Sequence, residues 1–264
     1  MTWPSTGDPR YIVYTSIFGD YDSLHDPRVP SANVRFMCFT DNRSVRSKAW
    51  ELVYVAPEGN GTDLNRRLKI NPHRYLPAHD YSLYIDGNVR ILGRLEGLFE
   101  KYSRITEIAA PRHPARNCLY EEAEVCIRSG KGDPARIRDV VAGYRQAGLP
   151  SAAGLYEFHM LFRRTFSPDV VRLMELWWSE YEKGAGRDQI TFPYAAWKCG
   201  ITIAALEESP RYSRKLFRLG YHNTELRLPL FRKALLYARL NRHNSVVFGA
   251  IADAADRVVS ARAK

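Results

Sequence analysis

The first half of the chain alternates short apolar, β-branched runs with turn residues. Tyr11–Phe18 has the sequence Y-I-V-Y-T-S-I-F and is followed by Gly19 and Asp20. Runs of about four to eight such residues, bounded by Gly, Pro, Asn or Asp, are typical of buried strands. The strands predicted in this way are Tyr11–Phe18, Val34–Thr40, Leu52–Val55, Tyr81–Ile85, Thr106–Ala110 and Leu155–Phe162.

Helical spacing of apolar positions appears between these strands and dominates the second half. Ser167-Pro168-Asp169 is a typical helix start, because it offers a capping residue, a proline at the first helical position and then an acid. The glycines at 184 and 200 are suited to helix ends. The predicted helices begin at Thr62 or Asp63 and end at Ile70, and otherwise span Leu95–Tyr102, Glu121–Arg128, Ala135–Ala147, Pro168–Glu182, Gln189–Lys198, Leu230–Asn241 and Val246–Val259.

The alternation of strands and helices predicts an α/β fold with a mixed, largely parallel sheet flanked by helices. Ligands of such sheets bind beyond the carboxyl ends of the strands. Three predicted strands are followed there by aspartates, namely Asp20, Asp41 and Asp86. This arrangement favours a crevice that binds a cation or a ribose. The alternative is that each aspartate only forms the turn at the start of its loop.

Composition adds one strong feature, a net charge of +10 with an isoelectric point near 9.5. A basic protein of this kind is expected to bind an anionic partner, which could be nucleic acid, a membrane surface or a phosphorylated small molecule. The excess is concentrated between Arg211 and Arg242, where nine basic residues face a single acid, Glu225. The question of the partner therefore concerns one segment more than the whole molecule.

Other classes are disfavoured by the sequence. No apolar run approaches the roughly 18 residues of a membrane-spanning helix, and the N-terminus lacks the basic and apolar regions of a secretory signal. No helix-turn-helix, zinc-finger or RNA-binding signature is visible, so no nucleic acid is expected. The cysteines have no zinc-ligand spacing, and we expect reduced thiols in a cytoplasmic protein. They are Cys38, Cys118, Cys126 and Cys199.

The segment Arg67–Val89 is the most informative for function. Its sequence, R-L-K-I-N-P-H-R-Y-L-P-A-H-D-Y-S-L-Y-I-D-G-N-V, resembles the segment that identifies the TOD1/MUCI70 glycosyltransferase-like family. Further family elements follow in the same order over roughly residues 11–200. They are Thr15–Asp22, Phe39–Asp41, Arg112–Arg116, Tyr120–Ala123, Trp178–Glu180 and Arg187–Phe192.

The resemblance implies a GT-A-type fold that binds a nucleotide sugar with the help of Mn²⁺ or Mg²⁺. Residues 1–225 would form this catalytic domain, and residues 226–264 a helical C-terminal extension packed on it or facing a membrane. Asp86-Gly87-Asn88 stands where such folds carry a D-x-D motif, so Asp86 and Asn88 would ligate the cation and Gly87 would let the phosphates approach.

Asn88 departs from the D-x-D pattern, because its amide oxygen brings no charge to the cation. Metal affinity would then be lower, or another group would help. His222 is a candidate third ligand by analogy with GT-A families. The alternatives are a turn amide for Asn88 and a surface or structural role for His222.

The resemblance also implies donor contacts. Asp20 and Tyr21 would contact the nucleoside, and Asp41 would accept hydrogen bonds from the ribose or the base. The helix before the D-G-N strand would turn basic side chains to the phosphates, although a solvated basic face is the alternative. The full set of predicted donor residues is Thr15, Phe18, Asp20, Tyr21, Asp41, Arg66, Arg67, Lys69, Asp86 and Gly87.

Asp188 is the predicted general base for an inverting transfer, because it lies at a helix start where its carboxylate can be aimed at a sugar hydroxyl. The alternative is a structural capping aspartate, and a retaining enzyme would use Asp188 only to position substrate. Rival carboxylates and other side chains are expected to bind the acceptor or the transferred sugar. They are His113, Arg116, Glu121, Glu122, Glu157, Arg187 and Gln189.

These features together predict a metal-dependent glycosyltransferase that moves a sugar from a nucleotide-sugar donor, by family analogy a UDP-sugar, to a glycan or lipid-linked glycan. The alternatives are a GT-A-like fold with altered chemistry, such as a hydrolase or a non-catalytic binding protein, and a basic nucleic-acid-binding protein.

The basic segment adds two expectations, one about binding of the diphosphate and one about contact with a membrane. Arg227 and the basic residues of Arg211–Arg218 flank His222 and would help to hold the diphosphate. Arg232, Arg239 and Arg242 are spaced to share one face of a predicted helix. Basic amphipathic helices bind anionic membranes, so we expect peripheral contact with the inner face of a membrane. The alternative is a solvated helix face.

Overall fold

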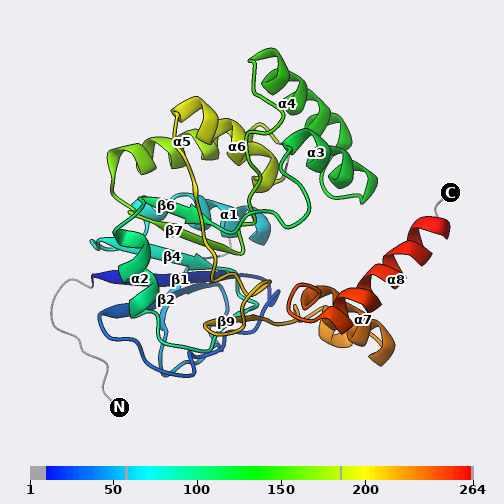
Figure 1. Cartoon of the computed structure of the whole chain (residues 1–264). Coiled ribbons are helices and arrows are strands. Elements are labelled where there is room, and N and C mark those ends of the chain that lie inside the picture. Colours follow the sequence, from blue (N-terminus) through cyan, green and yellow to red (C-terminus); the bar gives the residue numbers. More distant parts are fainter. Residues whose placement is uncertain (1–9, 57–58, 185, 263–264) are drawn as a thin grey trace.

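A seven-stranded sheet forms the centre of the protein, which is described here from a computed structural model covering residues 10–56, 59–184 and 186–262 (Figure 1). The strands, in spatial order, are β3 (Glu51–Tyr54), β2 (Val34–Thr40), β1 (Tyr11–Ile17), β4 (Tyr81–Ile85), β7 (Met160–Arg163), β6 (Ile108–Ala110) and β8 (Ala204–Ala205). The first four are parallel, β7 runs antiparallel to both β4 and β6, and β8 is parallel to β6. The predicted mixed, largely parallel sheet is confirmed.

The central strand β1 is buried along its whole length because it pairs with β2 and β4 and is covered on both faces. Successive side chains point to opposite faces of a strand. Ile12 and Tyr14 therefore pack into one apolar cluster, and Tyr11 and Val13 into another. This explains why its sequence is a continuous apolar run instead of an alternating one.

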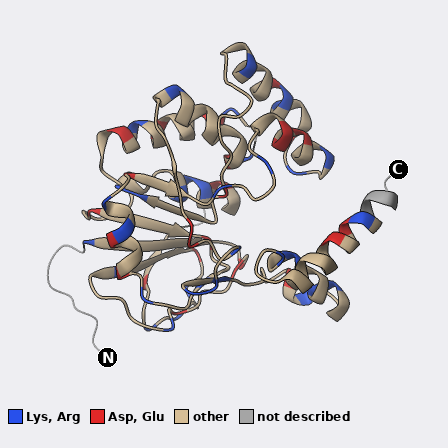
Figure 2. Ribbon diagram, in the orientation of Figure 1, with Lys and Arg blue, Asp and Glu red and all other residues tan. Residues whose placement is uncertain are grey.

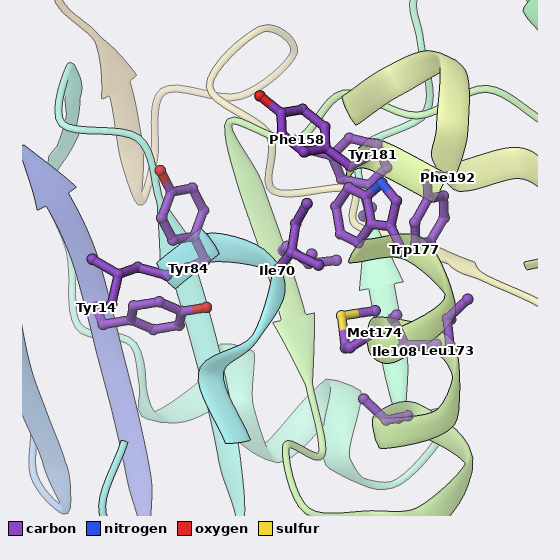
Figure 3. Close-up of a cluster of buried hydrophobic side chains, with 14 of the residues drawn as sticks. Tyr14, Ile70, Tyr84, Ile108, Phe158, Leu173, Met174, Trp177, Tyr181 and Phe192 are labelled. Atoms are coloured by element: carbon purple, nitrogen blue, oxygen red, sulfur yellow. The ribbon is translucent and has the colours of Figure 1, made fainter. Parts of the chain in front are cut away.

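Helices cover both faces of the sheet. On the Tyr14 face lie α1 (Gly61–Ile70), α5 (Pro168–Glu182) and α6 (Asp188–Cys199), whose apolar side chains meet those of the strands around Trp177 (Figure 3). On the other face lies α2 (Glu96–Ser103), with Phe99 in its core. The helices α3 (Leu119–Arg128) and α4 (Pro134–Gln146) share a separate apolar cluster that also includes Ile190 of α6.

A second, two-stranded sheet pairs β5 (Val89–Ile91) with β9 (Phe217–Leu219), and short 3-10 turns occur at Pro72–Arg74 and Glu225–Arg227. The apolar pattern missed β5, β8 and β9, because each has only two or three residues and forms by pairing with a distant segment. The strand predicted at Leu155–Phe162 is shorter and later, since regular pairing begins only at Met160.

The predicted helical extension is confirmed as α7 (Leu230–Leu240) and α8 (Val246–Arg262), which pack on each other (Figure 1). The predicted basic face is wrong in part. Arg239 binds Asp256, and Arg242 binds both Asp253 and Asp256, because the hairpin brings the acids of α8 opposite α7 (Figure 2). Of the three predicted arginines, Arg232 stays exposed.

Within the described ranges, none of the helices combines the length and the apolar character needed to cross a bilayer.

Candidate functional site

Two cavities open at the carboxyl ends of β1 and β4, at the sheet edge where the sequence predicted a ligand site. The large cavity has a volume of about 560 Å³ and the small cavity about 360 Å³. Arg66, Asp86 and Arg187 line both cavities, so the two spaces meet at these residues. The large cavity is also lined by Ser16, Ile17, Phe18, Gly19, Tyr21, Asp22, Asn60, Gly61, Thr62, Asn65, Gly87 and His222.

Asp86 directly follows β4 and begins a tight turn, in which the Val89 N–H donates to the Asp86 carbonyl. Its carboxylate is held from one side. The Tyr84 hydroxyl donates to Oδ1 at 2.9 Å, and Lys69 Nζ lies 3.7 Å from the same oxygen. The carboxylate is therefore fixed at the meeting point of the two cavities.

Gly87 is required by the packing of the turn. A Cβ atom at this position would lie 2.8 Å from both Asp22 Cβ and Ile17 Cγ1. No real side chain tolerates such an approach, so the glycine lets the loop after β1 pack against the turn after β4. Close approach of phosphates to Gly87 remains a prediction.

His222 reaches this turn from the far end of the chain, because β9 pairs with β5 just beside it. The Gly220 N–H donates to the Asn88 carbonyl at 2.7 Å. The Asn88 amide nitrogen lies 3.4 Å from His222 Nε2, and His222 Nδ1 lies 2.7 Å from Asp22 Oδ1. Burial lowers the pKa of His222, but the hydrogen bond and charge of Asp22 outweigh it, so the pKa is raised above its ordinary value.

The three predicted metal ligands are brought together. Asn88 Oδ1 is buried and has no hydrogen-bond partner among the described residues. Asp86 and His222 line the same cavity, and Asp22 orients the imidazole as a carboxylate partner does at many metal sites. In the described part of the chain no three His, Cys, Asp or Glu residues cluster as a metal site. A carboxylate, an amide oxygen and one imidazole are donor types that Mg²⁺ or Mn²⁺ can use together with phosphates, and metal binding by Asp86, Asn88 and His222 stays a prediction.

The aspartates that follow β1 and β2 take part in contacts that fix the start of the loop after β1. The Gly19 N–H donates to both carboxylate oxygens of Asp41, and Asn42 Nδ2 donates to Asp20 Oδ1 at 2.8 Å. Gly19 and Asp20 both have positive φ, of 60° and 54°, so the loop needs this support. Asp20 and Asp41 are absent from the described lining of the large cavity, and their predicted nucleoside contacts stay predictions.

Other predicted donor residues divide into two groups. Phe18 and the half-exposed Tyr21 line the large cavity. Thr15 is buried within β1, and neither Thr15 nor Arg67 is among the described residues that line the two cavities.

The first turn of α1 faces the large cavity. Asn60 caps the helix by accepting the Thr62 N–H at 2.8 Å, and Gly61, Thr62 and Asn65 line the cavity wall. The Asp63 and Leu64 N–H groups donate to the Asn60 carbonyl, so it is the positive end of the helix dipole that favours an anion here. The large cavity therefore has one wall suited to phosphate.

A buried ion-pair cluster forms the floor where the cavities meet. Asp188 Oδ2 lies 3.0 Å from Lys69 Nζ and 3.1 Å from Arg66 Nε. Burial raises the pKa of Asp188, but Arg66, Lys69 and Arg187 together hold it well below its usual range. A carboxylate with so low a pKa is a weak proton acceptor. This geometry favours an electrostatic role, while the predicted role as general base remains untested.

The small cavity gathers most of the predicted acceptor residues. Arg116 Nε donates to Glu122 at 2.8 Å, and Arg211 donates to Glu157. Burial raises the pKa of Glu157, against the effect of Arg211. The small cavity is lined, besides Arg66, Asp86 and Arg187, by Lys69, His113, Arg116, Glu122, Val125, Cys126, Ser129, Lys131, Glu157, Phe158, His159, Asp188, Gln189 and Arg211.

Glu121 is the exception. It is exposed and lines a groove between α3 and α4, because successive residues of a helix point about 100° apart and Glu122 faces the cavity. It therefore lies apart from the other predicted acceptor residues, and its contact with an acceptor stays a prediction.

Comparison with known proteins assigns the chain to a family. The TOD1/MUCI70, glycosyltransferase-like domain matches residues 6–217. The chain belongs to this family. A relative from Arabidopsis thaliana, described as "Probable hexosyltransferase MUCI70", is 28% identical over 210 residues, in an alignment that covers 69% of this chain and 36% of the relative. The chain therefore spans just over a third of that relative's length.

Among solved structures, this TOD1/MUCI70 domain is similar to mouse xyloside xylosyltransferase 1 in its apo form. The TM-score is 0.45 at 12% sequence identity, with 75% of this chain and 85% of the other covered.

Sequence reasoning on the TOD1/MUCI70 elements missed several residues of the site. Asp22 lies inside the recognised Thr15–Asp22 element, yet its bond to His222 depends on a contact across 200 residues. Asn65, whose amide holds the Ser16 carbonyl at 2.8 Å, lies directly before the predicted Arg66. Arg211 was expected beside His222, but it binds Glu157 in the small cavity.

Proposed function

We propose that this domain is a metal-dependent glycosyltransferase that moves a sugar from a nucleotide-sugar donor, a UDP-sugar, to a glycan or lipid-linked glycan. The observation that carries the proposal is the meeting of two cavities at Asp86, Arg66 and Arg187, in a chain of a glycosyltransferase-like family. Both volumes lie in or near the usual range for small-molecule sites. The large cavity would bind the nucleoside diphosphate, and the small cavity the sugar and the acceptor, as in a GT-A-type fold.

The large cavity offers groups for each part of the donor. The exposed ring of Tyr21, which lies 4.5 Å from the His222 ring, provides an aromatic face for the nucleoside. The first turn of α1 presents the positive end of its helix dipole, and Arg66 and Arg187 add positive charge to the same cavity, which suits phosphates. These features support a donor with an aromatic base and a diphosphate.

Asp86, Asn88 and His222 would hold Mn²⁺ or Mg²⁺. When bound, such an ion supplies positive charge for the leaving diphosphate. The buried, unpartnered Asn88 Oδ1 supports this assignment. Asp22 keeps His222 Nε2 turned toward Asn88, and Tyr84 keeps Asp86 at the meeting point.

In the transfer, the bond between the sugar carbon and the diphosphate oxygen breaks with its electron pair on that oxygen, while the acceptor oxygen bonds to the carbon and loses its proton. An inverting reaction needs a base for that proton. Among the carboxylates of the small cavity, Glu157 has the raised pKa that suits a base, and Asp188 the lowered pKa that suits electrostatic support.

A membrane-bound acceptor is part of the proposal. Leu230 and Phe231 are 82% and 68% exposed at the start of α7, next to the exposed Arg227 and Arg232. Apolar side chains among arginines are the composition of peripheral contacts with anionic lipid. All four cysteines are free, which is compatible with the cytoplasmic face of a membrane.

The test is a hydrolysis and transfer screen with UDP-, GDP-, CMP- and dTDP-sugars, each with Mn²⁺, with Mg²⁺ and with a chelator. We expect release of the nucleotide from a UDP-sugar only when a divalent ion is present. Release from none of the donors, together with no stabilisation by any nucleoside diphosphate in a thermal-shift assay, would reject the proposal. Turnover with water that no glycan acceptor accelerates would identify a hydrolase instead.

A further inference from the structure

Arg187 occupies a particular place, because it lines both cavities at the point where they meet. It is the residue before α6, with an extended backbone. Its Nη2 donates to Gln189 Oε1 at 3.1 Å, and Gln189 Nε2 donates in turn to the Tyr156 carbonyl at 3.3 Å. One edge of the guanidinium is therefore fixed by a chain of hydrogen bonds.

The other cations at this point are already paired. Arg66 Nε lies 3.1 Å from Asp188 Oδ2, and Arg66 Nη1 donates to Asn65 Oδ1. Lys69 Nζ lies 3.0 Å from Asp188 and 3.7 Å from Asp86. Both cations serve to keep the two carboxylates in place, and neither is fully available to a ligand.

Arg187 differs from both. Across the described ranges no carboxylate oxygen lies within 4.0 Å of its guanidinium, whereas Arg66 and Lys69 both pair with Asp188. Its Nε, like that of Arg66, is buried without a hydrogen-bond partner. Its neighbour Cys126 is a thiol whose pKa is raised by burial, so it brings no charge. A buried donor of a charged group is costly when it has no acceptor, and an anionic ligand removes that cost.

The local charge points the same way. Arg66, Lys69 and Arg187 meet Asp86 and Asp188, so three cations face two carboxylates. The balance leaves one positive charge where a donor would join nucleotide to sugar. Guanidinium groups bind phosphate and carboxylate with paired, charge-assisted hydrogen bonds.

We propose that Arg187 is an oxyanion-binding residue at the meeting point of the two cavities. The oxyanion is either a phosphate oxygen of the donor diphosphate or the carboxylate of an acidic transferred sugar. This inference rests on the proposed function, because the oxyanion that it assigns to Arg187 is part of the proposed nucleotide-sugar donor.

The test compares Arg187→Met and Arg187→Lys with the wild type and with Arg104→Met, which changes an exposed arginine at the end of α2. Calorimetry with Mn²⁺ measures the affinity of UDP, pyrophosphate, UDP-glucose and UDP-glucuronate, and NMR measures the affinity of uridine. We expect Arg187→Met to weaken UDP and pyrophosphate about tenfold or more, since a hydrogen bond to a charged group is lost. Uridine binding should not change, and Arg187→Lys should retain part of the affinity because a point charge remains.

Each other outcome is also decisive. Unchanged UDP affinity with a selective loss for UDP-glucuronate over UDP-glucose would assign the oxyanion to the sugar carboxylate. Wild type that binds pyrophosphate through Arg187 but binds no nucleoside diphosphate would reject the proposed donor and keep the anion site. Wild-type affinity for every ligand in Arg187→Met would overturn the inference, as would a wild type that binds neither UDP nor pyrophosphate. Arg187→Lys and ligand-free melting curves separate binding from a folding defect.

Discussion

Lys69 and Asp188 form a buried ion pair, with 3.0 Å between Nζ and Oδ2, although 119 residues separate them in the chain. The pair joins α1 to the start of α6 below the point where the two cavities meet. Arg66 binds the same carboxylate oxygen from its other side. The site is therefore built on a charged cluster that is almost closed to water, with Asp188 shared between two cations.

Removing the charge of Asp188 should destabilise the protein. Asp188→Asn leaves Lys69 buried with only the more distant Asp86, so we expect a loss of about 3 kcal/mol in the free energy of unfolding, measured with urea. Asp169→Asn is the matched control, because Asp169 pairs with Arg172 at the surface, where such pairs contribute less than about 1 kcal/mol. Equal losses in the two variants would contradict a structural role for the cluster.

The charge of Asp86 should control the effect of the metal ion. In the wild type we expect Mn²⁺ to raise UDP affinity, and in Asp86→Asn we expect most of this gain to disappear because the charged ligand is lost. Asp80→Asn is the control, since Asp80 pairs with Arg10 at the surface before β4. Calorimetry with and without Mn²⁺ measures the difference. A gain of the same size in Asp86→Asn would place the ion elsewhere.

Gly87→Ala should destabilise the turn by about 1–3 kcal/mol, because the new methyl group would overlap Asp22 and Ile17. Gly143→Ala on α4 is the control at an uncrowded position, since a methyl group added there would have no described neighbour within 4 Å. That variant should gain up to about 1 kcal/mol from helix propensity. Chemical denaturation of both variants gives the comparison, and a neutral Gly87→Ala would show that the loop after β1 can move away.

The free energy of unfolding should decrease as the pH falls, because of the buried His159 and the partly buried His113. Burial lowers the pKa of His113 to about 4, helped by Arg116, and lowers the pKa of His159 to about 3, helped by Arg211. An unfolded histidine has a pKa near about 6.5. Between these values the unfolded chain binds more protons, so the contribution is complete above the unfolded pKa and is lost as the pH falls toward the folded values.

The measurement is the free energy of unfolding from about pH 7 to about pH 5, with NMR titration of the imidazole protons. Arg116→Met should raise the pKa of His113, because a neighbouring cation is removed while Glu122 remains. Arg138→Met, on the exposed side of α4, should leave it unchanged. An ordinary pKa for His113 in the wild type would contradict its burial beside Arg116.

Binding to vesicles should depend on the start of α7. We expect the wild type to sediment with vesicles that contain anionic lipid and to remain in solution with neutral ones. The double change Leu230→Ser and Phe231→Ser should abolish sedimentation, whereas Ile105→Ser, which alters an exposed apolar residue before β6, should not. Binding that is insensitive to lipid charge, or to the double change, would remove the membrane from the proposed function.

Much of the fold is readable from local patterns. The strands β1, β2 and β4 have mainly apolar sequences, and α5 begins at Pro168 as its Ser-Pro-Asp start predicts. The short strands β8 and β9 are not readable, because two or three residues carry no period of their own. The basic face expected on α7 failed for a related reason, since the partners of Arg239 and Arg242 lie on another helix.

Residues of the site could be predicted from the sequence where a motif follows a strand or lies at the start of a helix. Asp86 after β4 and Asp188 at the start of α6 lie as the resemblance implied. What each carboxylate contacts could not be read, because burial and pairing decide its pKa, and both depend on residues far away in the chain. Asp188 pairs with Lys69, and Glu157 pairs with Arg211, and neither partner follows from spacing.

The pairing of β5 with β9 has a consequence for the order in which the protein is made. His222 and Asn223 reach the loop after β1 only once β9 has been synthesised, since Asn223 Nδ2 donates to the Asp20 carbonyl and His222 to Asp22. Strands β1 to β4, by contrast, are all complete at Ile85, long before β9. A nascent chain can thus pair β1 to β4 well before the wall formed by His222 exists, so a ligand of the large cavity would meet all of its lining residues only after residue 222 has been synthesised.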